Sequence, residues 1–480
     1  MKRRFQYFII VLLQLPIINA ASAQEKLVTY PAPDDALLND AFTVEVRIPG
    51  QEWQQIPVYL TQVDEVVNAK HTVRNSSVAF FDFSEHVEVQ VVHTSGAVHN
   101  VRIRPLSYGI KADVVLDTVR FSLDQPRNLS VEVNGDIFGN LHLFANPILS
   151  DRPNPDDPNV IYFGPGIHTF DNDRFVIPSG KTVYVDGGAV LRGQLSIRNA
   201  RDVKIIGRGM VEHTVKMGIE IANSTNVLVE GLFTTQCATG GSDSVTIRNV
   251  KAISYYGWGD GMNVFASNNV LFDRVFCRNS DDCTTVYATR KGFVGGARNI
   301  TMQNSTLWAD VAHPIFIGIH GNTENPEVIE NLRYVNIDIL DHKEAQLDYQ
   351  GCLSINAGDN NLIRDVTFED IRIEDFRQGQ LVNLRIFFNE KYCTAPGRGI
   401  ENIHFKNISY TGKNAELSII SGYNAERKVK NVVFENLVIN GKTIYDGMED
   451  KPAWYKTADM ARIYVGEHVE GVSFIKTTTR

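Results

Sequence analysis

Three aspartates lie close together in the sequence, among glycines, asparagines and aromatic residues. Asp260 lies in "GWGDGMNV", and Asp281 and Asp282 form an adjacent pair in "RNSDDCTTVY". The lone acid and the pair are 281 − 260 = 21 residues apart. Two carboxyl groups can hydrolyse a glycosidic bond, because one protonates the leaving oxygen while the other activates a water molecule. Crowding also raises the pKa of at least one such carboxyl, which keeps a proton available near neutral pH.

Other roles for these acids stay open at this point. Paired aspartates often cap a turn through local backbone hydrogen bonds, carboxylate oxygens bind calcium, and surface acids are often only solvated. Trp258, two residues before Asp260, favours the hydrolytic interpretation, because an aromatic face is a platform on which a sugar ring can stack.

Repeated short segments predict the elements that position the acids. After about residue 200, a polar residue, often Asn or Asp, is followed by alternating apolar and polar residues, as in "NVLVEG", "NVLFDR" and "NVVFEN". The first apolar residue of each segment recurs at intervals of 18 to 40 residues: Val203, Val227, Val245, Val270, Ile300, Leu332, Val366, Ile403, Val432 and Val472. Such repeats predict stacked β rungs, a parallel β-helix, because each unit buries its face on the next. The alternatives are a long sandwich and a propeller, whose blades need longer and more even repeats.

Stacked rungs would bring the three acids together. The rungs in this part of the chain span about 18 to 30 residues, so a separation of 21 residues is close to one rung. Neighbouring strands lie about 4.8 Å apart. We therefore expect Asp260 to lie beside the Asp281–Asp282 pair on one face of the coil.

The N-terminal part of the chain has a different pattern. Runs such as "FTVEVRIP" and "VEVQVVHT" alternate with period two between turn clusters, which predicts an antiparallel β-sandwich. The proline- and aspartate-rich "SDRPNPDDPN" at residues 150–159 predicts a domain boundary. We predict an all-β chain with an N-terminal β-sandwich domain at residues 24–155 and a parallel β-helix catalytic domain at residues 156–480.

The first residues predict export. "MKRR" is followed by an apolar run at residues 5–18 and by the small-residue site "ASA" at residues 21–23, which is typical of a cleaved signal peptide. The apolar run is too short to span a bilayer. We expect residues 1–23 to be removed and the mature protein to be secreted or periplasmic, with no membrane span.

Charge and cysteine content limit the partners. The chain has 480 residues, with 47 basic and 56 acidic side chains and a net charge of −9, which disfavours nucleic acid and, mildly, a polyanionic substrate. The five cysteines include no C-x-x-C pair, so zinc is not expected, and we predict that most are small buried residues of the β core. We expect no metal or other cofactor, and a monomer.

The stretches "GWGDGMNV", "NSDDCTTVY" and "AHPIFIGIHG" resemble the catalytic rungs of glycoside hydrolase family 49, the dextranases and isopullulanases, and of its clan relative family 28, the polygalacturonases. Family 49 pairs an N-terminal β-sandwich with a right-handed β-helix. The resemblance implies an inverting mechanism in which Asp281 is the general acid, while Asp260 and Asp282 position and deprotonate the water.

Departures from family 28 bear on the substrate. Its members carry Asn-Thr-Asp, Gly-His-Gly and Arg-Ile-Lys motifs, whose lysine grips a uronate carboxylate. Here the first motif is Trp-Gly-Asp, and Arg385-Ile386 is followed by Phe387. The loss of that cation favours a neutral glycan. We expect a dextranase-like enzyme for a neutral α-glucan, with a pectin hydrolase or an exo-acting α-galactosidase as alternatives.

Further residues are candidates for binding a polysaccharide or oligosaccharide substrate. Each has a competing role as a core, ladder or loop residue, and they are Trp258, Asn263, Tyr287, Lys291, His313, His320 and Arg385. Asp310, in "WADVAHP", is a candidate fourth acid near the cleft. Two other classes of function compete with hydrolysis: a polysaccharide lyase, which would need calcium-binding acids and a basic residue, and a non-catalytic glycan-binding β-helix.

Overall fold

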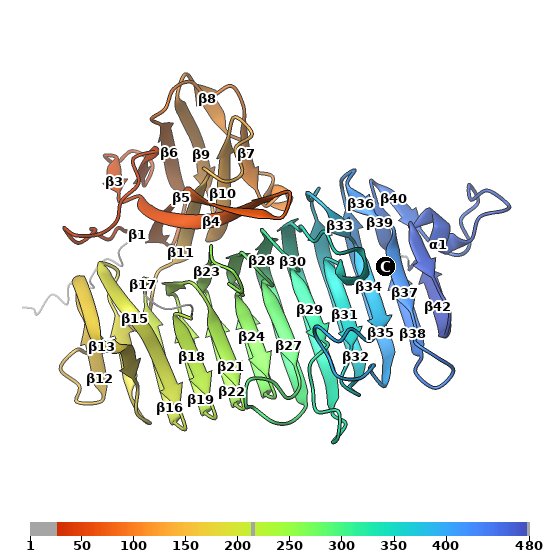
Figure 1. Ribbon diagram of the computed structural model, residues 1–480. Coiled ribbons are helices and arrows are strands. Elements are labelled where there is room, and N and C mark those ends of the chain that lie inside the picture. Colours follow the sequence, from red (N-terminus) through yellow and green to blue (C-terminus); the bar gives the residue numbers. More distant parts are fainter. Residues whose placement is uncertain (1–25, 213–216, 478–480) are drawn as a thin grey trace, which may run out of the picture.

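The computed structural model describes residues 26–212 and 217–477. The predicted signal peptide at residues 1–23 lies outside the described residues. Two bodies are visible: a small sandwich and a long coil beneath it (Figure 1).

The sandwich consists of two sheets that share one apolar core. The six-stranded sheet comprises β1 (Leu27–Val28), β4 (Tyr59–Val67), β5 (Lys70–Phe83), β7 (Val101–Arg104), β10 (Arg127–Val133) and β11 (Leu141–Pro147). The five-stranded sheet comprises β2 (Phe42–Arg47), β3 (Gln54–Ile56), β6 (Val87–His93), β8 (Asp113–Val115) and β9 (Thr118–Leu123), and the 3₁₀ turn η1 spans Leu106–Tyr108. In β2, alternate residues are buried, as the period-two pattern predicts.

The coil is a single sheet of 29 strands, nearly all paired in parallel, and the prediction of a sandwich followed by a parallel β-helix is confirmed. Its strands form three stacks. The first stack comprises β12 (Val160–Phe163), β14 (Thr182–Val185), β16 (Arg201–Gly207), β19 (Thr225–Glu230), β22 (Asp243–Arg248), β25 (Asn268–Asp273), the first parts of β28 (Ala297–Ala309), β30 (Val328–Asp341), β32 (Leu362–Ile373) and β35 (Gly399–Tyr410), and then β38 (Val429–Glu435) and β42 (Val469–Ile475).

The second stack comprises the first parts of β13 (Gly166–Val176) and β15 (Ala189–Arg198), β17 (Met210–Glu212), β20 (Phe233–Thr234), β23 (Lys251–Ile253), β26 (Phe276–Asn279), the last parts of β28, β30, β32 and β35, and β39 (Leu437–Ile439). The third stack comprises the last parts of β13 and β15, β18 (Ile219–Ala222), β21 (Cys237–Gly240), β24 (Met262–Phe265), β27 (Thr284–Tyr287), β29 (Ile315–Gly318), β31 (Leu353–Ala357), β34 (Val382–Ile386), β37 (Ser418–Ser421) and β41 (Ile463–Val465). Smaller elements are η2 (Leu347–Tyr349), β33 (Gly379–Gln380), β36 (Ala415–Glu416), β40 (Lys442–Ile444) and α1 (Thr457–Met460).

The predicted repeat is confirmed residue by residue in the first stack. All ten predicted apolar positions, from Val203 to Val472, pair in one register from strand to strand. The polar residue before most of them has a positive φ, for example 55° at Asn269 and 58° at Asn299. Their side chains form a ladder, since Asn299 donates to Asn269 at 2.8 Å and Asn331 donates to Asn299 at 2.6 Å. The recurring Asn or Asp therefore makes each corner of the coil, where short polar side chains tolerate the left-handed conformation.

The core of the coil is continuous and apolar. Four of the five cysteines lie in it, Cys393 is buried in a separate apolar cluster, and all five are free thiols. The prediction that the cysteines are buried core residues is confirmed. No helix within residues 26–212 and 217–477 is long and apolar enough to cross a membrane.

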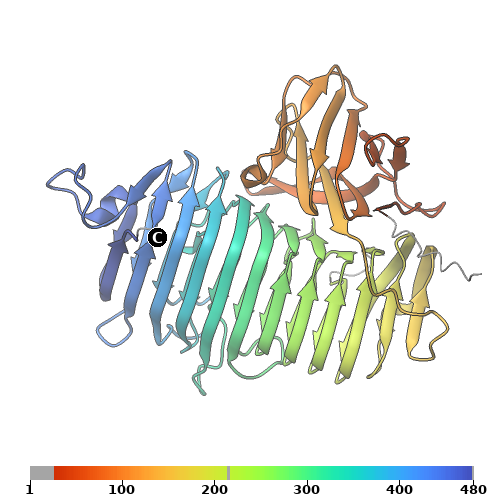
Figure 2. The same cartoon turned by 180° about the vertical axis from the view of Figure 1, so that it is seen from behind.

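The sandwich lies along the second stack, and the β4–β5 hairpin crosses above the coil (Figures 1 and 2). Buried ion pairs join the two bodies. Arg208 of the coil contacts Asp82 at 2.8 Å, and Arg104 of the sandwich contacts Glu374 at 2.7 Å. These contacts hold the sandwich against the second stack, one at the corner before this stack and one at the corner after it.

Candidate active site

The three aspartates lie in the turns between the second and third stacks. Asp260 precedes β24, and Asp281 and Asp282 precede β27. Met262 pairs with Thr284, so the local step between rungs is 284 − 262 = 22 residues. The counterpart of Asp260 on the next rung is therefore Asp282, and Asp281 lies one position earlier.

A cavity of about 790 Å³ brings the acids together with residues from several rungs. Its walls include all three aspartates and four of the predicted substrate-binding residues, Trp258, Tyr287, Lys291 and His320. Trp258 is the most open of these, with 70% of its surface exposed. A cavity of this size suits a sugar chain more than a single small ion.

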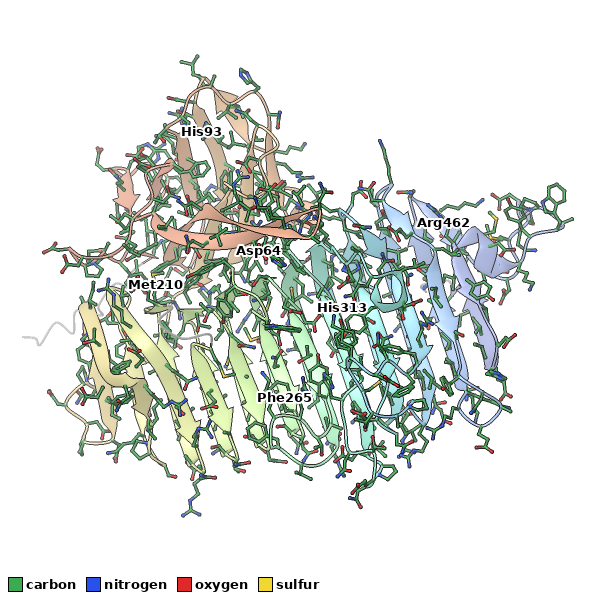
Figure 3. The ribbon with its side chains drawn as sticks, in the orientation of Figure 1. Asp64, His93, Met210, Phe265, His313 and Arg462 are labelled. Atoms are coloured by element: carbon green, nitrogen blue, oxygen red, sulfur yellow. The ribbon has the colours of Figure 1, made fainter. Side chains whose placement is uncertain are left out.

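Asp282 forms a close pair with His313. One carboxylate oxygen, Oδ1, accepts hydrogen bonds from the backbone N–H of His313 at 3.1 Å and from its ring Nδ1 at 2.7 Å. The other oxygen, Oδ2, lies 3.4 Å from the hydroxyl of Tyr287. His313, on the following rung, thus fixes the orientation of the Asp282 side chain. Figure 3 shows His313 on the middle rungs of the coil.

The hydrogen-bond partners of the two ring nitrogens of His313 indicate which of them carries a hydrogen. Nε2 contacts the backbone carbonyl of Tyr349, which can only accept a hydrogen bond, so Nε2 carries a hydrogen. Nδ1 faces the Asp282 carboxylate. Burial alone would lower the pKa of His313, but Asp282 more than offsets this and raises it. The Asp282 carboxylate therefore favours the protonated form of His313.

The other two acids favour their protonated forms. Burial, followed by the charge of Asp282, raises the pKa of Asp260 to about 7. Burial, followed by the charges of Asp260 and Asp282, raises the pKa of Asp281 well above its ordinary value. Three carboxyl groups in one enclosed site cannot all ionise cheaply.

Asn263 supports this site from the outer face of β24, since its neighbours Met262 and Val264 face the core, and it is not part of the cavity wall. Its Nδ2 donates to Oδ2 of Asp260 at 2.7 Å, and its Oδ1 accepts from Thr285 at 2.9 Å. Asn263 is fully buried. Its position suits it to orient Asp260.

Three cations lie on the cavity wall. Arg290, Lys291 and Lys391 all line it, and none forms an ion pair with a carboxylate among the described residues. Lys291 lies over the ring of Phe265, and Lys391 lies over the ring of Tyr392, at 5.7 and 4.7 Å from the ring centres. The cavity thus has cationic groups available for an anionic or hydroxyl-rich ligand.

The remaining predicted residues lie in different settings. His320 lines the cavity edge-on to Tyr287, with 4.9 Å between ring centres, and burial lowers its pKa to about 4, so it is neutral near pH 7. Arg385 lies outside the cavity wall and pairs with Asp348 at 2.7 Å. Asp310 is fully buried, lies outside the cavity wall and pairs with Arg278 at 2.8 Å.

Sequence reasoning missed several cavity residues. Glu344, Tyr349 and Tyr392 belong to long turns of the later rungs, and the rings of the two tyrosines stack at 4.9 Å. His71 comes from the sandwich, about 190 residues before Asp260 in the sequence. Growing distances between repeats signal long loops on the later rungs, but no local pattern shows which loop residues turn toward the acids.

Comparison with known proteins shows the family to which the chain belongs. Residues 184–453, more than half of the chain, match the model of glycosyl hydrolases family 28. The chain belongs to this family. The resemblance to families 49 and 28 that the motifs predict is confirmed.

A curated relative and two solved structures are similar to this family 28 chain. A putative galacturan 1,4-alpha-galacturonidase A from Aspergillus flavus is 21% identical over 232 residues, 43% of this chain and 49% of the relative. The match thus spans about half of that relative's length. Dex49A from Penicillium minioluteum shares the fold, with a TM-score of 0.60 and 14% identity over 93% of this chain and 96% of its own. A family 28 exopolygalacturonase from Yersinia enterocolitica has a TM-score of 0.42 and 10% identity over 82% of this chain and 97% of its own.

Proposed function

We propose that this family 28 protein is an exported glycoside hydrolase that cleaves α-glycosidic bonds of a polysaccharide with inversion. The observation that carries the proposal is the convergence of Asp260, Asp281 and Asp282 on one cavity. Membership of a glycosyl hydrolase family supports the reaction class.

The proposed roles are those that the family resemblance implies, and the raised pKa of Asp281 supports its role as the acid. Asp281, whose pKa is raised by burial, donates its proton to the glycosidic oxygen as the bond to the anomeric carbon breaks. Asp282, oriented by His313, and Asp260, oriented by Asn263, hold a water molecule on the opposite face of the sugar. One of them takes a proton from this water as its oxygen bonds to the anomeric carbon, which inverts the anomer.

The residues of the cavity wall indicate which class of polysaccharide the protein would bind. Phe387, at the position where the family 28 motif has lysine, is buried in an apolar cluster. Arg290, Lys291 and Lys391 nevertheless line the cavity without carboxylate partners among the described residues. These cations and the galacturonidase relative favour an α-linked polymer of uronic acids as the first substrate candidate. The neutral α-glucan expected from the sequence stays as the second candidate, supported by the stacking surfaces of Trp258 and Tyr392.

Hydrolysis assays with a matched variant test the proposal. Purified protein is incubated with polygalacturonate, dextran, pullulan and α-galactosides, and proton NMR follows the first product anomer. We expect reducing ends from polygalacturonate, an inverted anomer, and a loss of at least about a thousandfold in kcat for Asp281→Asn. Asp243→Asn, at a partly exposed ladder position of the first stack, is the control and should keep full activity. Retention of the anomeric configuration, or an active Asp281→Asn variant, would contradict the mechanism.

A further inference from the structure

The tip of the β4–β5 hairpin reaches the catalytic cavity. His71, near the start of β5, is a cavity-lining residue together with the three aspartates. The hairpin turns through two residues, Asn68 and Ala69, with φ values of 50° and 60°, which is the tight turn that suits the twist of paired strands. Figure 3 shows Asp64 on this hairpin, directly above the middle of the coil.

The hairpin tip is fastened to a cavity-lining segment of the coil. The Nζ of Lys343 donates a hydrogen bond to the backbone carbonyl of Val66 on β4. Lys343 precedes Glu344, which is itself part of the cavity wall. Within the hairpin, Arg74 pairs with Glu65 at 2.5 Å. The hairpin is therefore a fixed wall of the cavity, built by the sandwich.

His71 is oriented by a buried carboxylate. Its Nδ1 lies 2.5 Å from Oδ2 of Asp64, whose side chain is 2% exposed, whereas the side chain of His71 is 56% exposed. With Nδ1 occupied by Asp64, Nε2 is the ring atom left for another partner, and no protein partner for it is found among the described residues. A neutral ring accepts a hydrogen bond at Nε2 from a sugar hydroxyl, and a protonated ring donates one to a sugar oxygen.

We propose that His71, held by Asp64, is a substrate-binding residue that the sandwich contributes to the catalytic cavity. This inference rests on the proposed function, because the ligand is the sugar chain that the three aspartates would cleave. Asp64 is the positioning residue, since it contacts His71 and does not line the cavity.

The sandwich offers a matched control. His86 and Asp124 form a second histidine–aspartate pair with the same Nδ1–oxygen distance of 2.5 Å, but neither residue lines the cavity. Replacing His86 therefore removes the same chemistry from the same domain, away from the proposed ligand.

Binding is measured in an Asp281→Asn background, so that the sugar stays intact. Calorimetry with tetragalacturonate and with isomaltotetraose gives the Kd of the parent. One of the two oligosaccharides should bind to the parent. For that oligosaccharide, we expect His71→Ala to raise the Kd about tenfold, because the variant loses one hydrogen bond to a charged or polar partner. Asp64→Asn should have a smaller effect, and His86→Ala should have none. The ¹⁵N resonance of His71 Nε2 should shift when the sugar is added, while the Nε2 resonance of His86 should not change.

The outcomes separate the two proposals. If His71→Ala and the parent have equal Kd values and the Nε2 resonance does not shift, the proposed role of His71 is wrong. This holds even if the protein with its native Asp281 hydrolyses the polymer. Binding that depends on His71, without hydrolysis of any polymer, would uphold this inference and overturn the proposed function. A parent that binds neither oligosaccharide would overturn both.

Discussion

At the level of single residues, the pairing with His313 orients Asp282, one of the three proposed catalytic aspartates. The histidine donates to the carboxylate from its ring and its backbone, and its far nitrogen is anchored on the carbonyl of Tyr349. Such an arrangement fixes the direction of one carboxylate oxygen and leaves the other toward the cavity.

Replacing this histidine should slow the chemical step. His313→Ala removes the ring hydrogen bond that orients Asp282, so this carboxylate should turn away from its position in the site. We expect kcat to fall about a hundredfold, with KM changed less than about threefold. Steady-state kinetics on the best polymer measures the two constants. An increase in KM at constant kcat would instead indicate a sugar-binding role.

The raised pKa of Asp260 should appear as a stability effect. The folded state holds a proton on Asp260 up to a pKa of about 7, whereas the unfolded chain releases it near pH 4. Because the folded state binds more protons in this window, stability from this group falls as the pH rises from about 4 to 7. Asp260→Asn cannot ionise, so it should be more stable than the unmodified protein at pH 8, by on the order of 1–4 kcal/mol, and similar at pH 4.

Thermal unfolding at both pH values measures this difference. Asp243→Asn, which changes a partly exposed aspartate of the ladder, is the control and should show no pH-dependent gain. An Asp260→Asn variant that is equally stable or less stable at pH 8 would show that the charged form of Asp260 is not disfavoured in the fold.

At the level of elements, the polar corners of the first stack set the regular shape of the coil. Asn299 has a φ of 58° and bonds to Asn269 and Asn331, so it contributes both a backbone conformation and two ladder bonds. Asn299→Ala should lower the free energy of unfolding by about 1–2 kcal/mol, because alanine lacks the amide and strains the left-handed corner.

Asn299→Gly separates the two contributions. Glycine adopts the left-handed conformation freely but cannot bridge the rungs, so it should recover part of the loss. Chemical denaturation of both variants measures the difference. If glycine and alanine are equally destabilising, the ladder bonds alone account for the effect.

The strands and turns also show which parts of the structure can be predicted from the sequence. The period-two segments and their polar first residues predicted every rung from Val203 to Val472, because each rung repeats the same local requirement. The three acids could be predicted to meet for the same reason. Tyr349 and Tyr392 could not, since their positions depend on long turns that pack on one another and not on the repeat.

At the level of the whole molecule, a buried polar network joins the sandwich to the loops that carry the proposed catalytic aspartates. Arg278, three residues before Asp281, is fully buried between Asp310 at 2.8 Å and Asn140 of the sandwich at 2.8 Å. Asp310 also contacts Arg377 at 3.3 Å. This interaction between distant segments explains why Asp310 is buried in a structural network and why sequence alone left it as a candidate fourth acid.

Removing the buried charge should destabilise both bodies together. Asp310→Asn leaves Arg278 buried without its carboxylate, and we expect a loss of about 3–5 kcal/mol in the free energy of unfolding. Glu330→Gln, which breaks the partly exposed pair with Arg364 at 2.6 Å, is the control and should cost less than about 1 kcal/mol. Denaturant unfolding compares them. If both variants lower the free energy of unfolding by the same small amount, the buried network contributes little to holding the sandwich on the coil.

The buried thiols carry a further consequence for a chain that is expected to be exported. All five cysteines are free, and each is at most 3% exposed. In an oxidising compartment, the closed core is what keeps them from cross-linking, since a thiol must reach a partner or an oxidant to react. If the chain is exported as we propose, the rungs must close before non-native disulfide bonds form, because unfolding of the coil would expose these thiols to oxidation.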